Sequence, residues 1–225
     1  MISIASKVIS LLTFIIVLSS CEPQKKLPFL GHADVIQWKK NGHNYSDTIY
    51  PIIPNFHFLN QDSNRVNKYT YSDKIWIVEF FFTSCPTICP IMNQQLQRLY
   101  KKIDAAHQKE MQWISFSIDP NHDGPSILKK YQKEHGLFHK NWDFLTGNEE
   151  ETHRLGIEHF LTFAGKDEES AGGYAHSGSF TLVDRKGHVR GVYAITNFDM
   201  SVNEQEFDRM VNEINILYDE HIESQ

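Results

Sequence analysis

Apolar side chains run almost without interruption through residues 75–82, I-W-I-V-E-F-F-F. Nearly all of them are β-branched or aromatic and none is glycine or proline, which predicts a central strand covered on both faces. Two cysteines, Cys85 and Cys89, follow this run. Pro86 suits the first turn of a helix, so we expect a buried strand that delivers a thiol pair to a helix N-terminus, with Cys85 at the helix start. Apolar positions then recur at helical spacing, at Met92, Leu96, Leu99 and Ile103.

The alternation of strand and helix patterns continues along the chain. A second buried strand is predicted over residues 113–118, and a helix is predicted from Pro125 to about His135. A short strand over 142–146 and a further helical turn or two over 149–156 follow. This β-α-β-α-β order favours a largely parallel sheet with right-handed crossovers.

Shorter elements flank this centre. Two short strands around a turn are predicted over 50–59 and 65–70. A long exposed loop over 160–173 precedes a β-hairpin over 179–193, and an amphipathic helix from about Ser201 follows. The layout is thioredoxin-like: an α/β fold with a mostly parallel central sheet flanked by helices and an added N-terminal hairpin.

The N-terminal residues carry a separate pattern. Lys7 precedes an apolar segment, residues 8–18, that is too short to span a bilayer, and L-S-S-C then ends at Cys21. This ending resembles a bacterial lipobox. The resemblance implies that residues 1–20 are a lipoprotein signal peptide, cleaved before a Cys21 whose lipid chains anchor the protein stably. The alternative is an ordinary secretory signal with a coincidental cysteine, and either way the mature domain leaves the cytoplasm.

Length and composition indicate one domain after this signal. The chain has 225 residues, 40% of them hydrophobic, which is enough for one core. Residues 21–47 are mostly polar, without sustained periodicity, and are expected to be a tether, while 48–225 form the thioredoxin-like domain. The formal charge of -6 provides no basic surface, so nucleic acid is not an expected partner.

With Cys21 assigned to the anchor, Cys85 and Cys89 are the remaining cysteines, which in an oxidising compartment indicates a functional pair. On a helix, positions four apart share a face with Cβ atoms ~5–6 Å apart. A disulfide needs ~3.5–4.5 Å, so the first turn would have to adjust, whereas a shared metal tolerates the wider gap. The helix start favours thiolate, which serves both chemistries. The spacing is therefore compatible with both redox chemistry and metal binding. Two further alternatives are a plain stabilising disulfide and two buried thiols.

Three motifs together resemble the Sco/SenC family: F-F-F-T-S-C-P-T-I-C-P at 80–90, F-S-I-D-P-N-H-D at 116–123 and H-S-G-S-F-T-L-V-D at 176–184. The resemblance implies a thioredoxin fold, a copper ion bound by Cys85, Cys89 and His176, and a role in assembling the binuclear copper centre of cytochrome c oxidase. The chain departs from the family at two places. Ala175 stands where many members have an acidic residue, and Arg185-Lys186 replace the usual Pro-Asp of the hairpin turn.

The donor chemistry agrees with this implication. Two thiolates suit Cu(I), and an added imidazole gives a three-coordinate site that could also hold Cu(II). His176 stands out among twelve histidines because it follows a glycine-containing loop and precedes a strand. By the same resemblance Asp119 is expected near the site, supporting the ligands or contacting a partner, although Asp before Pro is also an ordinary strand terminator. We expect the other nearby histidines, His122, His135 and His139, to be solvated.

The leading functional interpretation is a copper metallochaperone, lipid-anchored in the bacterial cell envelope and facing the periplasm. Its partner would be the copper-bearing subunit of cytochrome c oxidase or another periplasmic copper or thiol protein. The alternative is a thiol–disulfide reductase that uses Cys85 and Cys89 to keep the oxidase's copper-ligand cysteines reduced and does not need His176. A copper-dependent redox sensor is a third possibility. Peroxiredoxin chemistry is disfavoured because its usual Thr-x-x-Cys spacing would put cysteine at Pro86, and thioredoxin itself would show Cys-x-x-Cys.

Overall fold

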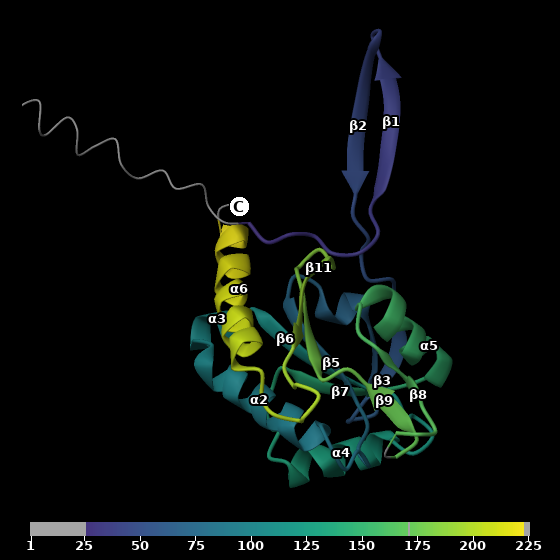
Figure 1. Cartoon of the computed structure of the whole chain (residues 1–225), viewed down its shortest axis with the longest axis vertical. Coiled ribbons are helices and arrows are strands. Elements are labelled where there is room, and N and C mark those ends of the chain that lie inside the picture. Colours follow the sequence, from purple (N-terminus) through teal and green to yellow (C-terminus); the bar gives the residue numbers. More distant parts are fainter. Residues whose placement is uncertain (1–25, 171, 223–225) are drawn as a thin grey trace, which may run out of the picture.

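The computed structural model describes residues 26–170 and 172–222, and its body is built on a seven-stranded mixed sheet (Figure 1). In chain order the strands are β3 (His57–Asn60), β4 (Arg65–Asn67), β5 (Ile75–Phe81), β6 (Met111–Ser117), β7 (Trp142–Thr146), β10 (Ser179–Val183) and β11 (Val189–Ala194). Their order across the sheet is β11-β10-β5-β6-β7-β3-β4.

The direction of the strands differs between the centre and the edges of the sheet. β5 pairs in parallel with β6, and β6 pairs in parallel with β7. All the other pairings are antiparallel. The predicted α/β, thioredoxin-like fold with an added hairpin is confirmed, but the sheet is mixed rather than mostly parallel. The reason is that the hairpins β3–β4 and β10–β11 each join the parallel centre through an antiparallel strand.

The central position of β5 is as predicted, and all of its residues are buried. Successive side chains of a strand point to opposite faces, so both faces of the sheet need cover. On one face Phe81 packs on Tyr131, with ring centroids 5.4 Å apart. On the other face Phe80 packs edge-on against Phe160 at 5.7 Å. This double burial explains why the strand reads as a continuous apolar run.

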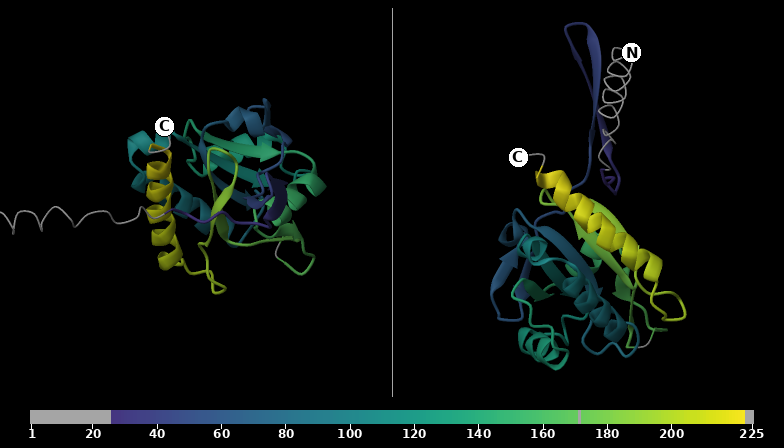
Figure 2. Two further views of the ribbon diagram at one scale, coloured as in Figure 1. Left: turned by 90° about the horizontal axis from the view of Figure 1, so that it is seen from above. Right: turned by 90° about the vertical axis from the view of Figure 1, so that its left-hand side faces the viewer.

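Helices cover both faces of the sheet. The Phe81 side carries α2 (Cys89–Lys102), α4 (Pro125–Glu134) and α6 (Glu204–Ile222), and α6 runs along the body in Figure 2. Ion pairs Arg98–Glu204 and Lys102–Asp208 join α2 to α6. The Phe80 side carries α5 (Glu149–Arg154) and the π-helix η2 (Leu155–His159). Two short helices, η1 (Lys68–Tyr71) and α3 (Ala105–Lys109), complete the domain.

Two small sheets lie in segments where no strand was predicted. β1 (Asp34–Lys40) and β2 (His43–Ile49) form an isolated antiparallel hairpin inside the expected tether, and every one of their residues is exposed. Figure 1 shows this hairpin projecting away from the body. β8 (Ala164–Lys166) pairs with β9 (Tyr174–His176) at the ends of the predicted long loop.

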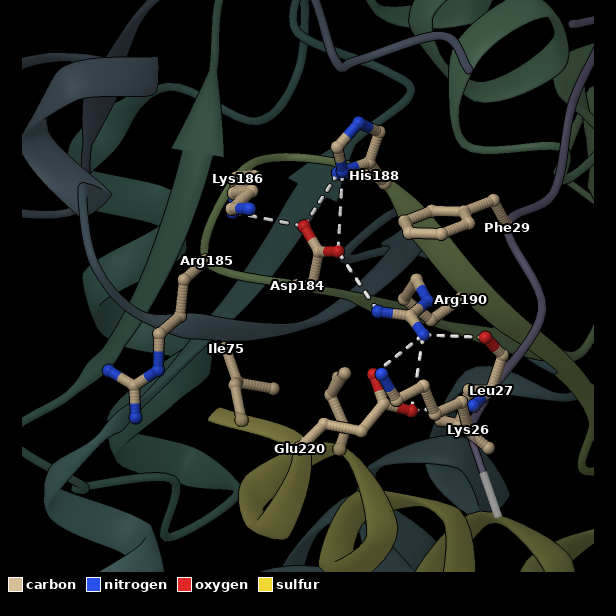
Figure 3. A pocket seen from close by; sticks show the side chains of 11 residues that line it. Lys26, Leu27, Phe29, Ile75, Asp184, Arg185, Lys186, His188, Arg190 and Glu220 are labelled. Atoms are coloured by element: carbon tan, nitrogen blue, oxygen red, sulfur yellow. Dashed lines mark hydrogen bonds and ion pairs between the residues drawn. The ribbon is translucent and has the colours of Figure 1, made fainter. Parts of the chain in front are cut away.

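The buried Arg190 links the start of the described chain to the C-terminal helix α6 through ion pairs and hydrogen bonds (Figure 3). Arg190 is 4% exposed and forms ion pairs with Glu220 at 2.8 Å and Asp184 at 3.1 Å. It also donates hydrogen bonds to the carbonyl oxygens of Leu27 and Pro28, and the Leu27 amide donates to Glu220. These contacts border a cavity of about 310 Å³, which Ile75 at the start of β5 also lines.

The predicted signal peptide, residues 1–20, and the predicted lipidation site Cys21 lie outside the described residues. Among the residues that are described, no helix has the length and apolar character needed to cross a membrane.

Candidate metal centre

Three donor side chains converge beyond the C-terminal end of β5. The ligand atoms of Cys85, Cys89 and His176 all lie within 4.8 Å of one another, and all three residues are buried. Within residues 26–170 and 172–222 no second group of three such side chains could hold a metal ion. The fold therefore brings His176 to the cysteines as expected, although it lies 87 positions beyond Cys89.

The turn that carries Cys85 is held by a buried carboxylate. Asp123 has no exposed surface and accepts hydrogen bonds from the Thr83 amide at 2.9 Å and from the Ser117 hydroxyl at 2.7 Å. The Thr83 hydroxyl also donates to Asp123. His122, expected to be solvated, has an exposed side chain but places Nδ1 2.8 Å from Asp123. The short polar motif after β6 therefore fixes the loop in which Cys85 lies.

Helix α2 begins later than predicted. Its first residue is Cys89, so Cys85 lies in the preceding loop rather than at the helix start. The proline of the first turn is Pro90, not Pro86. The physical reason lies in the chain just before the helix, where the Cys85 amide donates to the Phe82 carbonyl at 3.2 Å and forms a turn instead of a helical bond. The loop lets the two sulfurs approach without the constraint of helical i,i+4 geometry.

His176 closes the site from the end of β9. Its Nε2 lies 3.2 Å from the Cys89 sulfur, and its ring stands edge-on to Phe82 at 6.0 Å between centroids. The loop before β9 crosses Phe82 closely at Gly172, which has φ +91°, and a Cβ there would lie 2.7 Å from the Phe82 ring. A larger residue at this position would push the loop, and His176 with it, away from the cysteines.

The electrostatics favour one thiolate in the cysteine pair. The Cys89 thiol hydrogen-bonds to Cys85 and, with help from His176, holds the pKa of Cys85 well below its usual range. Burial and the neighbouring Cys85 sulfur raise the pKa of Cys89. Thiolate therefore forms first on Cys85, which is 9% exposed against 1% for Cys89. Thiolate is the form that attacks disulfides and binds soft metals.

The donor set fits a soft metal ion. It consists of two thiols and an imidazole, the donors that suit copper and zinc. His176 Nε2, 3.2 Å from the Cys89 sulfur, is the ring nitrogen that faces the two thiols. The other nitrogen, Nδ1, is buried and has no hydrogen-bond partner among the described residues. Both cysteines are reduced in the structure, and the same pair has the proximity that thiol–disulfide exchange requires.

Asp119 approaches the site through a tyrosine that the sequence analysis missed. The Tyr174 hydroxyl lies 3.2 Å from the Asp119 carboxylate and 2.8 Å from that of Glu149. Its ring packs on Phe82 at 5.5 Å. Tyr174 precedes His176 by two positions on β9, so its side chain points to the same side of the strand. The two carboxylates thus position the strand that carries His176.

Glu79 is a second residue that the sequence analysis did not single out. It is 1% exposed on β5, and one of its oxygens accepts a hydrogen bond from the Ser115 hydroxyl at 2.6 Å. The other oxygen has no hydrogen-bond partner among the described residues. Burial raises the pKa of this carboxyl to about 7. The signal in the sequence was a single acidic residue inside an otherwise apolar strand.

Comparisons with known proteins identify similar chains. The SCO1/SenC family model matches residues 46–212. The crystal structure of a SCO1/SenC family lipoprotein from Bacillus anthracis is 28% identical, with a TM-score of 0.64, and the match covers 74% of this chain and 95% of that one.

Two further solved structures are similar. BsSco, described with a disulfide switch and as a member of the Sco family of cytochrome c oxidase assembly proteins, is 32% identical with a TM-score of 0.60. That match covers 72% of this chain and 92% of BsSco. Arabidopsis thaliana ScoI, solved with copper bound, is 26% identical with a TM-score of 0.59, and the match covers 73% of this chain and 99% of ScoI.

Proposed function

The chain belongs to the SCO1/SenC family, and we propose that it is a copper-binding assembly factor for the copper centre of cytochrome c oxidase. The observation that carries this proposal is the convergence of Cys85, Cys89 and His176 within 4.8 Å. Two relatives support it, because ScoI of Arabidopsis was solved with copper bound and BsSco is described as a member of a family of oxidase assembly proteins.

Copper is the cargo in this proposal, and the three side chains have different parts in holding it. Two thiolates from Cys85 and Cys89 suit Cu(I), which they can bind nearly linearly. The imidazole of His176 adds a nitrogen donor, which Cu(II) favours. The Phe82 ring beside His176 keeps water from one side of the site. A buried site with two or three protein ligands leaves room for a ligand from the acceptor protein during transfer.

We further propose that the protein is anchored by lipid on Cys21 and faces the periplasm. The lipobox-like L-S-S-C ending supports this, as does the description of the Bacillus anthracis relative as a lipoprotein. The client would then be the copper-bearing oxidase subunit or another copper or thiol protein at the outer face of the membrane.

The reductase alternative rests on the same cysteines. In that reaction the Cys85 thiolate attacks a client disulfide, forms a mixed disulfide and releases the first client thiolate. Cys89 then attacks the Cys85 sulfur and releases the second client thiolate. Two electrons pass to the client as the Cys85–Cys89 bond forms. The description of a disulfide switch in the relative BsSco supports this alternative. The exchange does not need His176, which only helps to lower the pKa of Cys85. Replacing His176 therefore provides the means to separate the two functions.

The first experiment titrates the reduced soluble domain with Cu(I) and with Cu(II) and measures the reduction potential of the cysteine pair. We expect one copper ion per chain, loss of tight Cu(I) binding in Cys85→Ala and Cys89→Ala, and a selective loss of Cu(II) affinity in His176→Ala. His135→Ala, an exposed histidine on the C-terminal side of α4, is the matched control.

The second experiment measures the copper content of the oxidase in a strain that carries His176→Ala. A metallochaperone should leave the oxidase deficient in copper, because release and capture of the ion involve all three ligands. A reductase should load it normally, since thiol exchange needs only the cysteine pair. Normal loading would therefore remove the metallochaperone proposal and leave the reductase.

A further inference from the structure

Within residues 26–170 and 172–222 nothing covers the hairpin β1–β2, although it carries several apolar side chains. It forms a two-stranded sheet of its own. Val35, Ile36, Trp38, Tyr45 and Ile49 are each 44–62% exposed. A lone two-stranded hairpin is only marginally stable in water. A projecting hairpin with this many exposed apolar groups is expected to bury them against something outside the domain.

The register puts the two aromatic rings of the hairpin side by side on one face. Residues directly opposite each other in an antiparallel pair share a face, and neighbouring pairs alternate between faces. Trp38 lies opposite Tyr45, and their rings stack 5.8 Å apart at 15°. The adjacent pairs Gln37–Ser46 and Lys39–Asn44 put polar side chains on the other face. The aromatic groups therefore lie together on one face instead of encircling the hairpin.

Charge is distributed unequally along the hairpin. Its outer half, residues 37–46, contains Lys39, Lys40 and His43 and no acidic residue. The two aspartates, Asp34 and Asp47, lie closer to the body. Tryptophan and tyrosine rings favour the headgroup region of a bilayer, and lysines near a surface are attracted to anionic lipids. The outer half thus combines the two features that an interfacial membrane contact needs.

The hairpin also projects from the end of the body at which the chain enters. The described chain starts beside the C-terminal part of α6, where Leu27 is bound to Glu220 and Arg190. Figure 1 shows the hairpin extending beyond that same end, and Figure 3 shows the contacts that hold the entering chain. Cys21 precedes Lys26 by only five residues, so a lipid on Cys21 would put the membrane on this side.

We propose that residues 37–46 insert into the headgroup region of an anionic bilayer and orient the domain on the membrane. The inference rests on the proposed anchor at Cys21, which brings the hairpin and the bilayer together. Trp38 and Tyr45 enter the interface side by side, and Lys39 and Lys40 contact lipid phosphates.

Trp38 makes the test specific. Trp76, Trp113 and Trp142 are 0–2% exposed, whereas Trp38 is 45% exposed, so acrylamide in the water should quench Trp38 selectively. Acrylamide is uncharged, so anionic lipid does not repel it. The full chain, purified from membranes, is reconstituted into phosphatidylcholine vesicles with and without phosphatidylglycerol. We expect acrylamide quenching to fall several-fold in the anionic vesicles, and bromines near the headgroup end of the acyl chains to quench Trp38 more than bromines near the methyl end. Trp38→Phe should abolish both effects.

Charge variants separate lipid contact from a structural effect. Lys39→Glu/Lys40→Glu should restore acrylamide quenching without changing thermal stability, because no hairpin residue belongs to the described core. Lys130→Glu/Lys133→Glu on α4 makes the same change in charge far from the hairpin and should leave the protection intact.

Whether the chain floats with the vesicles in a density gradient shows separately whether the lipid anchor is present. If the chain does not float, residues 22–225 are held on the vesicles by an N-terminal histidine tag and a nickel-chelating lipid, and the same quenching is measured.

Two results would overturn the proposal. The first is that Trp38 stays accessible to acrylamide and insensitive to brominated lipid at the vesicle surface. The second is that its protection needs no lipid, either because it grows with protein concentration in detergent, which would indicate a second copy, or because it arises only when an oxidase subunit is added.

Discussion

Glu79 should limit the stability of the metal-free protein at alkaline pH. The carboxyl is 1% exposed, and in the part of the chain that the structure describes one of its oxygens has no hydrogen-bond partner. Burial raises its pKa from an ordinary 4.5 to about 7. Each tenfold change in proton affinity corresponds to ~1.4 kcal/mol, so ionised Glu79 should destabilise the fold by about 3 kcal/mol.

The direction with pH follows from the raised pKa. The unfolded chain loses the proton of Glu79 near its ordinary pKa, whereas the folded protein keeps it until about pH 7. The stabilising effect of the bound proton is therefore complete below about pH 4.5 and is lost as the pH rises through about 7. Glu79→Gln resembles the protonated acid, because its carbonyl can still accept the Ser115 hydrogen bond, and it cannot ionise.

The assay is chemical unfolding of reduced, metal-free wild type and Glu79→Gln between about pH 5 and about pH 8.5. We expect the two proteins to be similar at the acidic end and the variant to be more stable by about 3 kcal/mol at the alkaline end, a rise of about 6–12 °C in Tm. Titrating groups that do not interact with Glu79 are common to both proteins and cancel in the difference. Cys89 does not cancel fully, because the charge of Glu79 helps to raise the pKa of Cys89. Glu134→Gln, an exposed acid on α4, is the control and should show no such trend. A difference between wild type and Glu79→Gln that does not change with pH would refute the reasoning.

Cys21→Ser should release the protein from membranes or block its processing, and a mass spectrum of unmodified mature Cys21 would contradict the anchor. Arg190→Ala should lower the free energy of unfolding by about 3–5 kcal/mol, because it breaks buried ion pairs that include Glu220; a loss below about 1 kcal/mol in urea unfolding would show that the N-terminal segment is held by other contacts. Tyr174→Phe removes a hydroxyl that lies 2.8 Å from Glu149. It should weaken Cu(II) binding in a titration and spare Cu(I), and equal effects on both ions would exclude a role through His176.

The local pattern of apolar residues was sufficient to predict those elements whose burial in the fold matches their secondary structure. The continuous apolar run predicted β5 because both faces of that strand pack on the core. The hairpin β1–β2 left no such pattern, since none of its residues is buried and nothing in the domain selects apolar residues at alternate positions. The mixed direction of the sheet also escaped prediction, because direction depends on how the flanking hairpins dock and not on the composition of the strands.

The ligands of the candidate site could be predicted because the type of each side chain identifies it as a metal donor. Cys85, Cys89 and His176 were named from donor type and motif. The start of α2 was wrong by four residues because either Pro86 or Pro90 could occupy a first helical turn, and only the turn at Phe82 decides between them. Tyr174 was missed because its two carboxylate partners, Asp119 and Glu149, come from separate elements. Such a contact exists only once the chain has folded.

On the proposed function, β5 also limits how far from the membrane copper can be delivered. Its first residue, Ile75, lines the cavity beside Leu27, and Cys85 follows its other end. A strand of this length spans ~23 Å at ~3.3 Å per residue. The five residue steps from Cys21 to Lys26 can add at most ~18 Å when fully extended. With Cys21 in the bilayer, Cys85 would travel within a layer roughly 40 Å deep above the membrane. An acceptor must present its own copper ligands inside that layer, and a target held farther out would need a second, diffusible carrier.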